Sequence, residues 1–200
     1  MPNRKSSDDI NTRIARRVST LRATRKLTLD ELAKRCDVSR SMISLIERGE
    51  SSPTAIVLEK VATGLGVSLA SLFEAEVADG KPVVRRNDQL SWRDPASGYV
   101  RRNISPPDFR SPIQIVEVDF PPRAKVAYES STREVQVDQQ IWVLDGAIDI
   151  LWGDEVFALK EGDCLAMRLD RPTAFSNPHR KAARYVVVIT SNPFANVANS

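Results

Sequence analysis

A run of hydroxyl and basic side chains between Ser39 and Arg48 has the chemistry needed to recognise a polyanion. In "SRSMISLIER", helical spacing places Ile43 and Ile46 on one face, and the other face is small, polar and basic. Such a face fits a DNA major groove about 12 Å wide, where an arginine can donate two hydrogen bonds to guanine. The start of the helix also offers backbone N–H groups to a phosphate. The segment therefore predicts a DNA-reading helix, and composition alone leaves a merely solvated amphipathic helix as the alternative.

A second candidate site is the stretch "RLDRPTAFSNP", residues 168–178. It is typical of the rim of a small β-barrel, at a place where a histidine would bind a metal, but Thr173 stands there. The single histidine of the chain, His179, follows in "NPHRKAAR", where the pattern favours a solvated loop residue over a metal ligand. A bound transition metal needs three or four converging imidazole or carboxylate donors. This stretch therefore argues against a metal site.

The composition sets limits on both candidate sites. The 200 residues, of which 42% are hydrophobic, are enough for two small packed domains. Residues 1–73 carry 13 Lys and Arg against 8 Asp and Glu, a net charge of +5, whereas the whole chain carries only +3. Positive charge is therefore concentrated in the first third of the chain, where we expect an anionic partner to bind.

The cysteines and the apolar runs bear on where the protein works. Cys36 and Cys164 fall in different predicted domains, so we expect no disulfide, and a reducing compartment fits. The longest apolar run, "YVVVI", is too short to span a bilayer. We expect a cytoplasmic protein with no membrane partner.

Helical periodicity extends across residues 10–73 and predicts five helices. Thr28, with Glu31 three residues later, forms a capping box that opens the second helix. The third helix is the candidate DNA-reading segment. The dipeptide Ser52-Pro53 starts the fourth helix, and "SLASLF" forms a last short one.

The helical period is lost after about residue 75. Seven of the 12 prolines lie between residues 75 and 122, which excludes continuous helix there. Beyond residue 111, short apolar runs such as "IQIVEVDF" and "ARYVVVIT" alternate with turns, as in a sandwich or barrel. Asp145-Gly146 between two runs predicts a β-hairpin with a type I′ turn. The predicted division is a flexible tail (1–9), a helical domain (10–75), a linker with edge strands (76–110) and a β domain (111–195).

The segment "LRATRKLTLDELAKRCDVSRSMISLIERGESSPTAIVLEKVATGLGVSLASLF" resembles, without a gap, the helix-turn-helix of the Cro/C1-type (XRE) repressor family. The resemblance implies that Arg22 pairs with Glu47 and so ties the first helix to the recognition helix. Asp37 replaces the usual turn glycine, and aspartate tolerates the left-handed conformation better than most residues. Leu29 replaces a glutamine that often contacts DNA. The residues that stand at the usual DNA-facing positions are Thr28, Ser39, Arg40, Ser41, Ser44, Leu45 and Arg48.

The segment "VQVDQQIWVLDGAIDILWGDEVFALKEGDCLAMRLDRPTAFSNP" resembles the cupin barrel, a double-stranded β-helix, that follows an XRE helix-turn-helix in many bacterial repressors. Counting from the motif glycines puts Gln139 at the position of a metal-binding glutamate and Thr173 at that of a histidine. The other two histidine positions are occupied by Arg133 and Val135, or by Thr132 and Glu134. All four usual ligands are replaced, so the resemblance implies neither a metal nor another cofactor.

An open barrel mouth would leave a pocket lined by the side chains that strand alternation turns inward. Arg133 would be its fixed charge and could hold an anion through a forked hydrogen bond. The predicted ligand-binding residues are Arg133, Val135, Gln139, Thr173 and Phe175. The alternative is a barrel that is filled by its own side chains and serves only for dimerisation or protein interaction, as in an antitoxin-like subunit or a scaffold.

The two resemblances together predict an all-α five-helix helix-turn-helix domain followed by an all-β cupin barrel. The expected function is that of a homodimeric, sequence-specific transcriptional regulator, more specifically a repressor. Its expected partners are double-stranded DNA with a near-palindromic operator, a second copy of the chain and a small-molecule effector. Without a metal, the known cupin reactions lose their electrophile, so we expect no enzyme activity.

Overall fold

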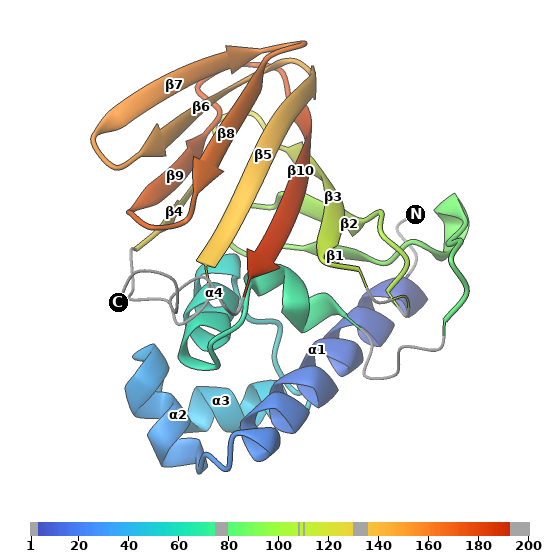
Figure 1. Cartoon of the computed structure of the whole chain (residues 1–200), viewed down its shortest axis with the longest axis vertical. Helices are drawn as coiled ribbons and strands as arrows, with labels where there is room; N and C mark the ends of the chain where they lie inside the picture. Colours follow the sequence, from blue (N-terminus) through green and yellow to red (C-terminus); the bar gives the residue numbers. More distant parts are fainter. Residues whose placement is uncertain (1–3, 75–79, 108, 110, 130–135, 193–200) are drawn as a thin grey trace.

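The helices at the start of the chain lie together below the β-sheets in Figure 1, and we call them the helical layer. The computed structural model describes residues 4–74, 80–107, 109, 111–129 and 136–192. The four α-helices of this part are α1 (Arg4–Thr24), α2 (Leu29–Cys36), α3 (Arg40–Glu47) and α4 (Ala55–Gly64). Helix α1 begins at Arg4, inside the segment predicted to be a flexible tail. None of the described helices is both long enough and apolar enough to span a bilayer.

The prediction of five α-helices is wrong, because the segment expected to form the last one is the 3-10 helix η1 (Leu69–Phe73). Ser68 caps it, and the Ser71 N–H donates to the Ser68 carbonyl at 3.0 Å, an i+3 bond rather than an i+4 bond. Glu74 already has extended backbone angles. The segment is thus too short to develop α-helical hydrogen bonding.

The starts and stops of the helices follow from side-chain caps. The capping box at Thr28 is present as predicted: its hydroxyl accepts from the Glu31 N–H at 3.2 Å, and the Glu31 carboxylate accepts from the Thr28 N–H at 2.7 Å. Asp37 ends α2 in the left-handed conformation at φ 49°. Helix α4 is capped by Thr54, and not opened by Ser52-Pro53, because the Thr54 hydroxyl accepts from the Val57 N–H at 3.3 Å.

The β domain consists of two antiparallel sheets that lie above the helical layer in Figure 1. A short 3-10 helix, η2 (Arg86–Asp88), precedes it. The six-stranded sheet has the order β1-β2-β3-β10-β5-β8, and the four-stranded sheet the order β4-β9-β6-β7. The strands are β1 (Ser91–Arg93), β2 (Val100–Asn103), β3 (Ile113–Phe120), β4 (Lys125–Tyr128), β5 (Gln136–Asp145), β6 (Ala147–Trp152), β7 (Glu155–Lys160), β8 (Cys164–Arg168), β9 (Thr173–Ser176) and β10 (Ala183–Asn192). This arrangement is consistent with a cupin, but within the described strands no ladder joins the sheets into the predicted closed barrel.

Asp145-Gly146 does not form the predicted hairpin. Strands β5 and β6, which it connects, belong to different sheets and do not pair with each other. Only Gly146 has positive φ, at 77°, whereas a type I′ turn needs positive φ at both central residues. A Cβ on Gly146 would lie 2.6 Å from the Ala182 carbonyl oxygen. This dipeptide is therefore a tight corner between the sheets, and the two-residue hairpin is the β6–β7 connection at Gly153-Asp154.

The helical layer and the β domain share one hydrophobic core. Asp94, only 1% exposed, accepts at 3.0 Å from the Ala55 N–H at the start of α4. Phe73 of η1 meets Trp92 of β1 edge to face at 6.0 Å, and Trp92 meets Tyr99 at 5.9 Å. Aromatic contacts thus run without interruption from the helices into the interior of the β domain.

Candidate functional site

An ion pair between α1 and α3 stabilises the arrangement of the helix-turn-helix. Arg22 of α1 and Glu47 of α3 pair through two hydrogen bonds, Nε to Oε1 at 2.6 Å and Nη2 to Oε2 at 2.7 Å. The bond to Glu47 raises the pKa of Arg22, and Arg22 Nη1 also donates to the Leu27 carbonyl at 2.9 Å. The pair that the resemblance implied is therefore formed, and it fixes α3 relative to the long first helix.

The seven predicted DNA-facing residues make up the candidate reading surface: Thr28 caps α2, and the other six belong to α3 and its two caps. Five of them are exposed and two are half-buried. The exposed residues are Thr28, Ser39, Arg40, Ser41 and Arg48, and the half-buried ones are Ser44 and Leu45. Ile43 and Ile46, at 0% and 2% exposure, occupy the opposite face and anchor the helix in the core. The amphipathic arrangement predicted for this segment is thus present.

The two arginines of this surface have weak partners. Arg40 Nε lies 3.4 Å from an Asp30 carboxylate oxygen, and the two side chains are 60% and 71% exposed. Arg48 Nη2 lies 2.9 Å from Glu50, and its Nη1 donates to the Ser44 hydroxyl. Ion pairs this exposed contribute about 0–1 kcal/mol. Both guanidinium groups can therefore exchange these partners for phosphate or base at little cost.

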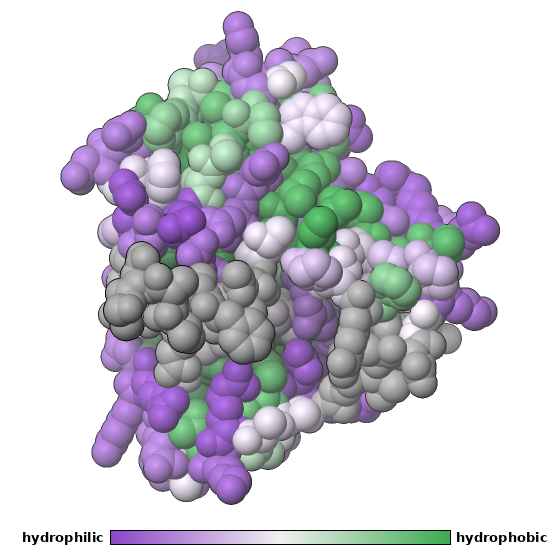
Figure 2. Space-filling view, in the orientation of Figure 1, coloured by the Kyte–Doolittle hydropathy of each residue, from purple (hydrophilic) through white to green (hydrophobic). Residues whose placement is uncertain are grey.

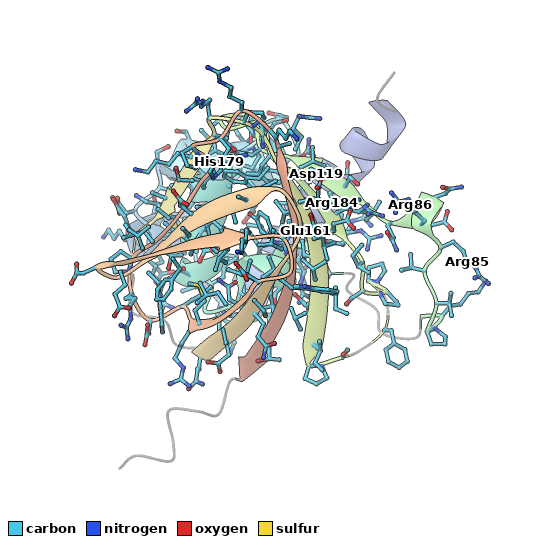
Figure 3. All side chains as sticks on the ribbon, turned by 90° about the horizontal axis from the view of Figure 1, so that it is seen from above. Arg85, Arg86, Asp119, Glu161, His179 and Arg184 are labelled. Atoms are coloured by element: carbon cyan, nitrogen blue, oxygen red, sulfur yellow. The ribbon has the colours of Figure 1, made fainter. Side chains whose placement is uncertain are left out.

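The β domain contains a cavity of about 90 Å³ at its end next to the helices. Three predicted ligand-binding residues, Gln139, Thr173 and Phe175, lie in its wall. Arg133 and Val135 lie outside the described residues. His179, labelled in Figure 3, belongs to the loop between β9 and β10, and β10 begins at the end of its sheet away from the helices (Figure 1). It is exposed and takes no part in the cavity.

Most residues of the cavity wall were missed by the sequence analysis, among them an arginine, two tyrosines and a glutamate. Arg101 of β2 lies in the cavity wall with the phenols of Tyr99 and Tyr128, whose oxygens are 3.5 Å apart. Burial raises the pKa of both tyrosines. Glu59 of α4 closes the cavity from the helical side and is 8% exposed. The pocket is thus bounded by both parts of the chain, where sequence reasoning expected the β domain alone.

The described donors do not fit the metal that cupin proteins commonly hold. Thr173 Oγ1 already donates to the Arg171 carbonyl at 3.1 Å, and Gln139 offers a single neutral amide oxygen. Arg101 adds a fixed positive charge at the same cavity. In the part of the chain that the structure describes, no three His, Cys, Asp or Glu side chains converge as a metal site would require.

Sequence comparison decides the family of the chain. A helix-turn-helix family model (HTH_3) matches residues 18–72. The HTH-type transcriptional regulator SutR of Escherichia coli (strain K12) is 30% identical over 168 residues, which cover 82% of this chain and 89% of SutR. The chain belongs to the XRE family of helix-turn-helix transcriptional regulators. DNA binding through the N-terminal domain is the function of this family that the match supports.

A solved structure is similar in fold to both parts of this XRE regulator. An HTH_3 family transcriptional regulator from Vibrio cholerae superposes with a TM-score of 0.72 at 23% identity, covering 92% of this chain and 97% of the other. At that identity the likeness shows the fold alone. It covers the helical layer and the β domain together.

The prediction from the sequence that this chain has no enzyme activity has to be corrected. The structure of hydroxypropylphosphonic acid epoxidase from S. wedmorenis aligns over 92% of this chain and 100% of its own, with a TM-score of 0.45 and 18% identity. So low a score carries no argument about a reaction in this XRE regulator. Because one fold can host both enzymes and regulators, the fold gives no ground for excluding catalysis.

One signal in the sequence pointed to the missed arginine. In "SGYVRRNIS", strand alternation puts Tyr99 and Arg101 on the same side, and Arg101 pairs in register with the buried Val118 of β3. The surrounding prolines, however, predict a linker with edge strands for this segment, and a linker gives no reason to expect a charged pocket wall.

Proposed function

We propose that this XRE regulator reads a near-palindromic operator as a homodimer, acts as a repressor in the cytoplasm, and holds a small-molecule effector in its β domain. The proposed DNA contacts are Thr28, Ser39, Arg40, Ser41, Ser44, Leu45 and Arg48. The observation that carries the proposal is the exposed face of α3, whose two arginines have only weak, solvent-exposed partners. Two such helices in a dimer would lie one DNA turn apart, about 34–36 Å.

Selection of bound sequences from a random DNA library, followed by affinity measurement, tests the DNA-reading part. Replacing Arg40 by Ala should cost about 1–3 kcal/mol and relax specificity at one base pair if Arg40 donates to a base. A uniform loss across all sequences would instead assign Arg40 to a phosphate. Arg180→Ala is the matched control, because Arg180 is also exposed but lies beyond β9, in the same loop as His179. If both variants lose affinity equally, α3 is not the reading element.

We assign the dimer contact to the outer face of the six-stranded sheet. Trp142 of β5 is 51% exposed there and Ile113 of β3 is 46% exposed, with the half-buried Val186 and Val188 of β10 between them. Figure 2 shows apolar surface over the middle of this sheet. A contiguous apolar patch on a sheet face is typical of an interaction surface.

Sedimentation velocity tests this assignment. Trp142→Asp should convert the dimer to a monomer, because it places a charge at the centre of the buried contact. Val156→Asp is the control, since Val156 is 65% exposed but lies on β7 of the other sheet. Dimers of both variants, or monomers of both, would contradict the proposed face.

The effector role is supported by the cavity that Gln139, Thr173 and Phe175 line. The alternative is a β domain that serves only for dimerisation or as a scaffold. Thermal unfolding against a panel of metabolites separates the two, because a ligand at about a hundred times its Kd stabilises the fold by about 2.7 kcal/mol. A scaffold would show no stabilisation by any compound.

A further inference from the structure

Arg101 is the most unusual polar side chain of the cavity. It is 7% exposed, and its buried Nε and Nη2 have no hydrogen-bond partner among the described residues. Burial lowers the pKa of this guanidinium, whereas the nearby Tyr99, Tyr128 and Glu59 raise it. Arginine stays protonated in proteins, so a permanent charge is held in an apolar interior. Such burial is costly unless an acceptor completes the hydrogen bonds.

The two unpartnered donors are those that form a fork for a carboxylate. In the Arg22–Glu47 pair of this same chain, Nε and Nη2 each donate to one oxygen of the Glu47 carboxylate. Arg101 leaves the same two nitrogens without a partner among the described residues. Two parallel N–H groups match the two oxygens of a carboxylate in spacing and direction.

The surroundings of Arg101 fix this fork in place. The guanidinium of Arg101 lies over the Phe73 ring, 4.9 Å from the ring centroid. The ring covers one face of the guanidinium and leaves the in-plane N–H donors for hydrogen bonds. The walls of the cavity are otherwise largely apolar, with Phe120, Phe175 and Val187 among them. Glu129 and Arg171 add one charge of each sign to the wall. The site therefore combines a buried cationic fork with walls that are mostly suited to a short hydrocarbon chain.

The size of the cavity limits the ligand. A volume of about 90 Å³ is well below the roughly 300–1,000 Å³ of pockets that hold drug-sized ligands, so the cavity suits only a small molecule. We propose that Arg101 binds the carboxylate of a small monocarboxylic acid, of the size of propionate, in the cavity between the β domain and helix α4. This inference rests on the effector role proposed above and names the class of ligand.

The position of the cavity explains how such a ligand would act on the DNA-binding domain. Glu59 of α4 and the segment Ser68–Ala70 form part of its wall. Helix α4 packs directly on α2: Lys60 pairs with Asp37 at 2.9 Å, and Gly64 lies so close to Cys36 that a Cβ would approach its side chain to 2.7 Å. A ligand in this cavity would therefore lie beside an element that packs on α2 of the helix-turn-helix.

Calorimetric titration of the full-length protein with propionate tests the proposal, with propionamide as the neutral isostere and sulfate as an inorganic anion. We expect binding of propionate only, and a loss of affinity of at least about tenfold in Arg101→Met, because hydrogen bonds to charged groups contribute about 1.5–3 kcal/mol. Equal binding of propionamide would overturn the proposal. Binding of sulfate alone would overturn the assignment to a carboxylate.

The stability of Arg101→Met without ligand separates a binding role from a structural one. A ligand-binding arginine leaves the variant as stable as the wild type or more stable, because a costly buried charge is replaced by an apolar side chain of similar length. Marked destabilisation would show that Arg101 is paired within the protein and would overturn the proposal.

Glu59→Gln provides a second variant should Arg101→Met fail to fold. Removing this negative charge beside the site should tighten propionate binding, and weaker binding would count against a carboxylate there. Selection of operator DNA by α3 is measured separately. A protein that reads DNA but ignores propionate would refute this inference and leave the DNA-reading proposal standing.

Discussion

The reading surface of α3 and the cavity of the β domain are built in opposite ways. The reading surface comes from residues 28–48, one contiguous segment whose caps and turn are set by its own side chains. The cavity is assembled from residues between Glu59 and Ile189, contributed by α4, η1 and six strands. A function carried by a local motif can be recognised from spacing, whereas a pocket of this kind exists only after the chain has folded.

The first way to test this contrast is alkaline pH, which should unfold the protein by ionising the buried phenols of the cavity. All three tyrosines of the chain, Tyr99, Tyr128 and Tyr185, line it. Burial raises the pKa of each above its ordinary value of about 10. The neutral phenols therefore stabilise the fold below about pH 10, and this stabilisation is lost as the pH rises through the folded-state pKa values.

Tyrosinate absorbance and circular dichroism followed together measure this effect. The helical domain has no tyrosine, yet we expect both signals to change in one transition, because the two parts share a core. Tyr185→Phe should move the transition to higher pH. Tyrosinate that forms near pH 10 with unchanged dichroism would show that the phenols are open to solvent.

Breaking the Arg22–Glu47 pair is the largest single-residue effect expected in the helical domain. Glu47→Ala leaves Arg22 without its carboxylate, and we expect a loss of about 3 kcal/mol, at the low end for a buried pair because the Arg22 side chain is 20% exposed. Urea denaturation measures the loss. Glu50→Ala, which removes the exposed partner of Arg48, should cost far less, because a solvent-exposed ion pair contributes little to stability. Equal losses would mean that the pair does not hold α3.

Much of the helical domain was predictable because its determinants are neighbours in sequence. Thr28 and Glu31 form their capping box, Asp37 takes the left-handed conformation that its place in the turn demands, and Arg22 reaches Glu47. Each of these follows from a short spacing or from a motif. The order of the α-helices was correct, and only the last segment was given the wrong helix type.

The β domain was less predictable because its strands pair across long separations. The dipeptide Asp145-Gly146 has the composition of a hairpin, but the pairing of β5 with β10 and β8 places it at a corner. Strand alternation alone could have turned Arg101 inward, but Glu59 and Tyr128 become its neighbours only in the folded molecule. Spacing along the chain carries no information about such contacts.

Gly146→Ala tests whether that corner is as tight as the structure indicates. Its positive φ costs alanine about 1–2 kcal/mol, and contact with the Ala182 carbonyl adds to this, so we expect a loss of at least about 2 kcal/mol in urea denaturation. Gly162→Ala is the control, because Gly162 also has positive φ, 91°, but a Cβ there meets nothing within 4 Å. Equal losses would show that backbone conformation alone determines the cost.

The smallest expected effect separates two neighbouring candidates for the start of α4. Thr54→Ala removes the hydroxyl that accepts from the Val57 N–H and should cost about 1 kcal/mol or somewhat less, because Asp94 still accepts from the Ala55 N–H. Ser52→Ala should cost under about 0.5 kcal/mol, since the bond that the Ser52 hydroxyl accepts from Asn11, 3.3 Å long, lies at the surface. Thermal unfolding of the two variants measures the difference. The reverse order would mean that the helix begins at Ser52-Pro53, as the local sequence suggests, and that the Asp94 contact from the β domain does not set its first turn.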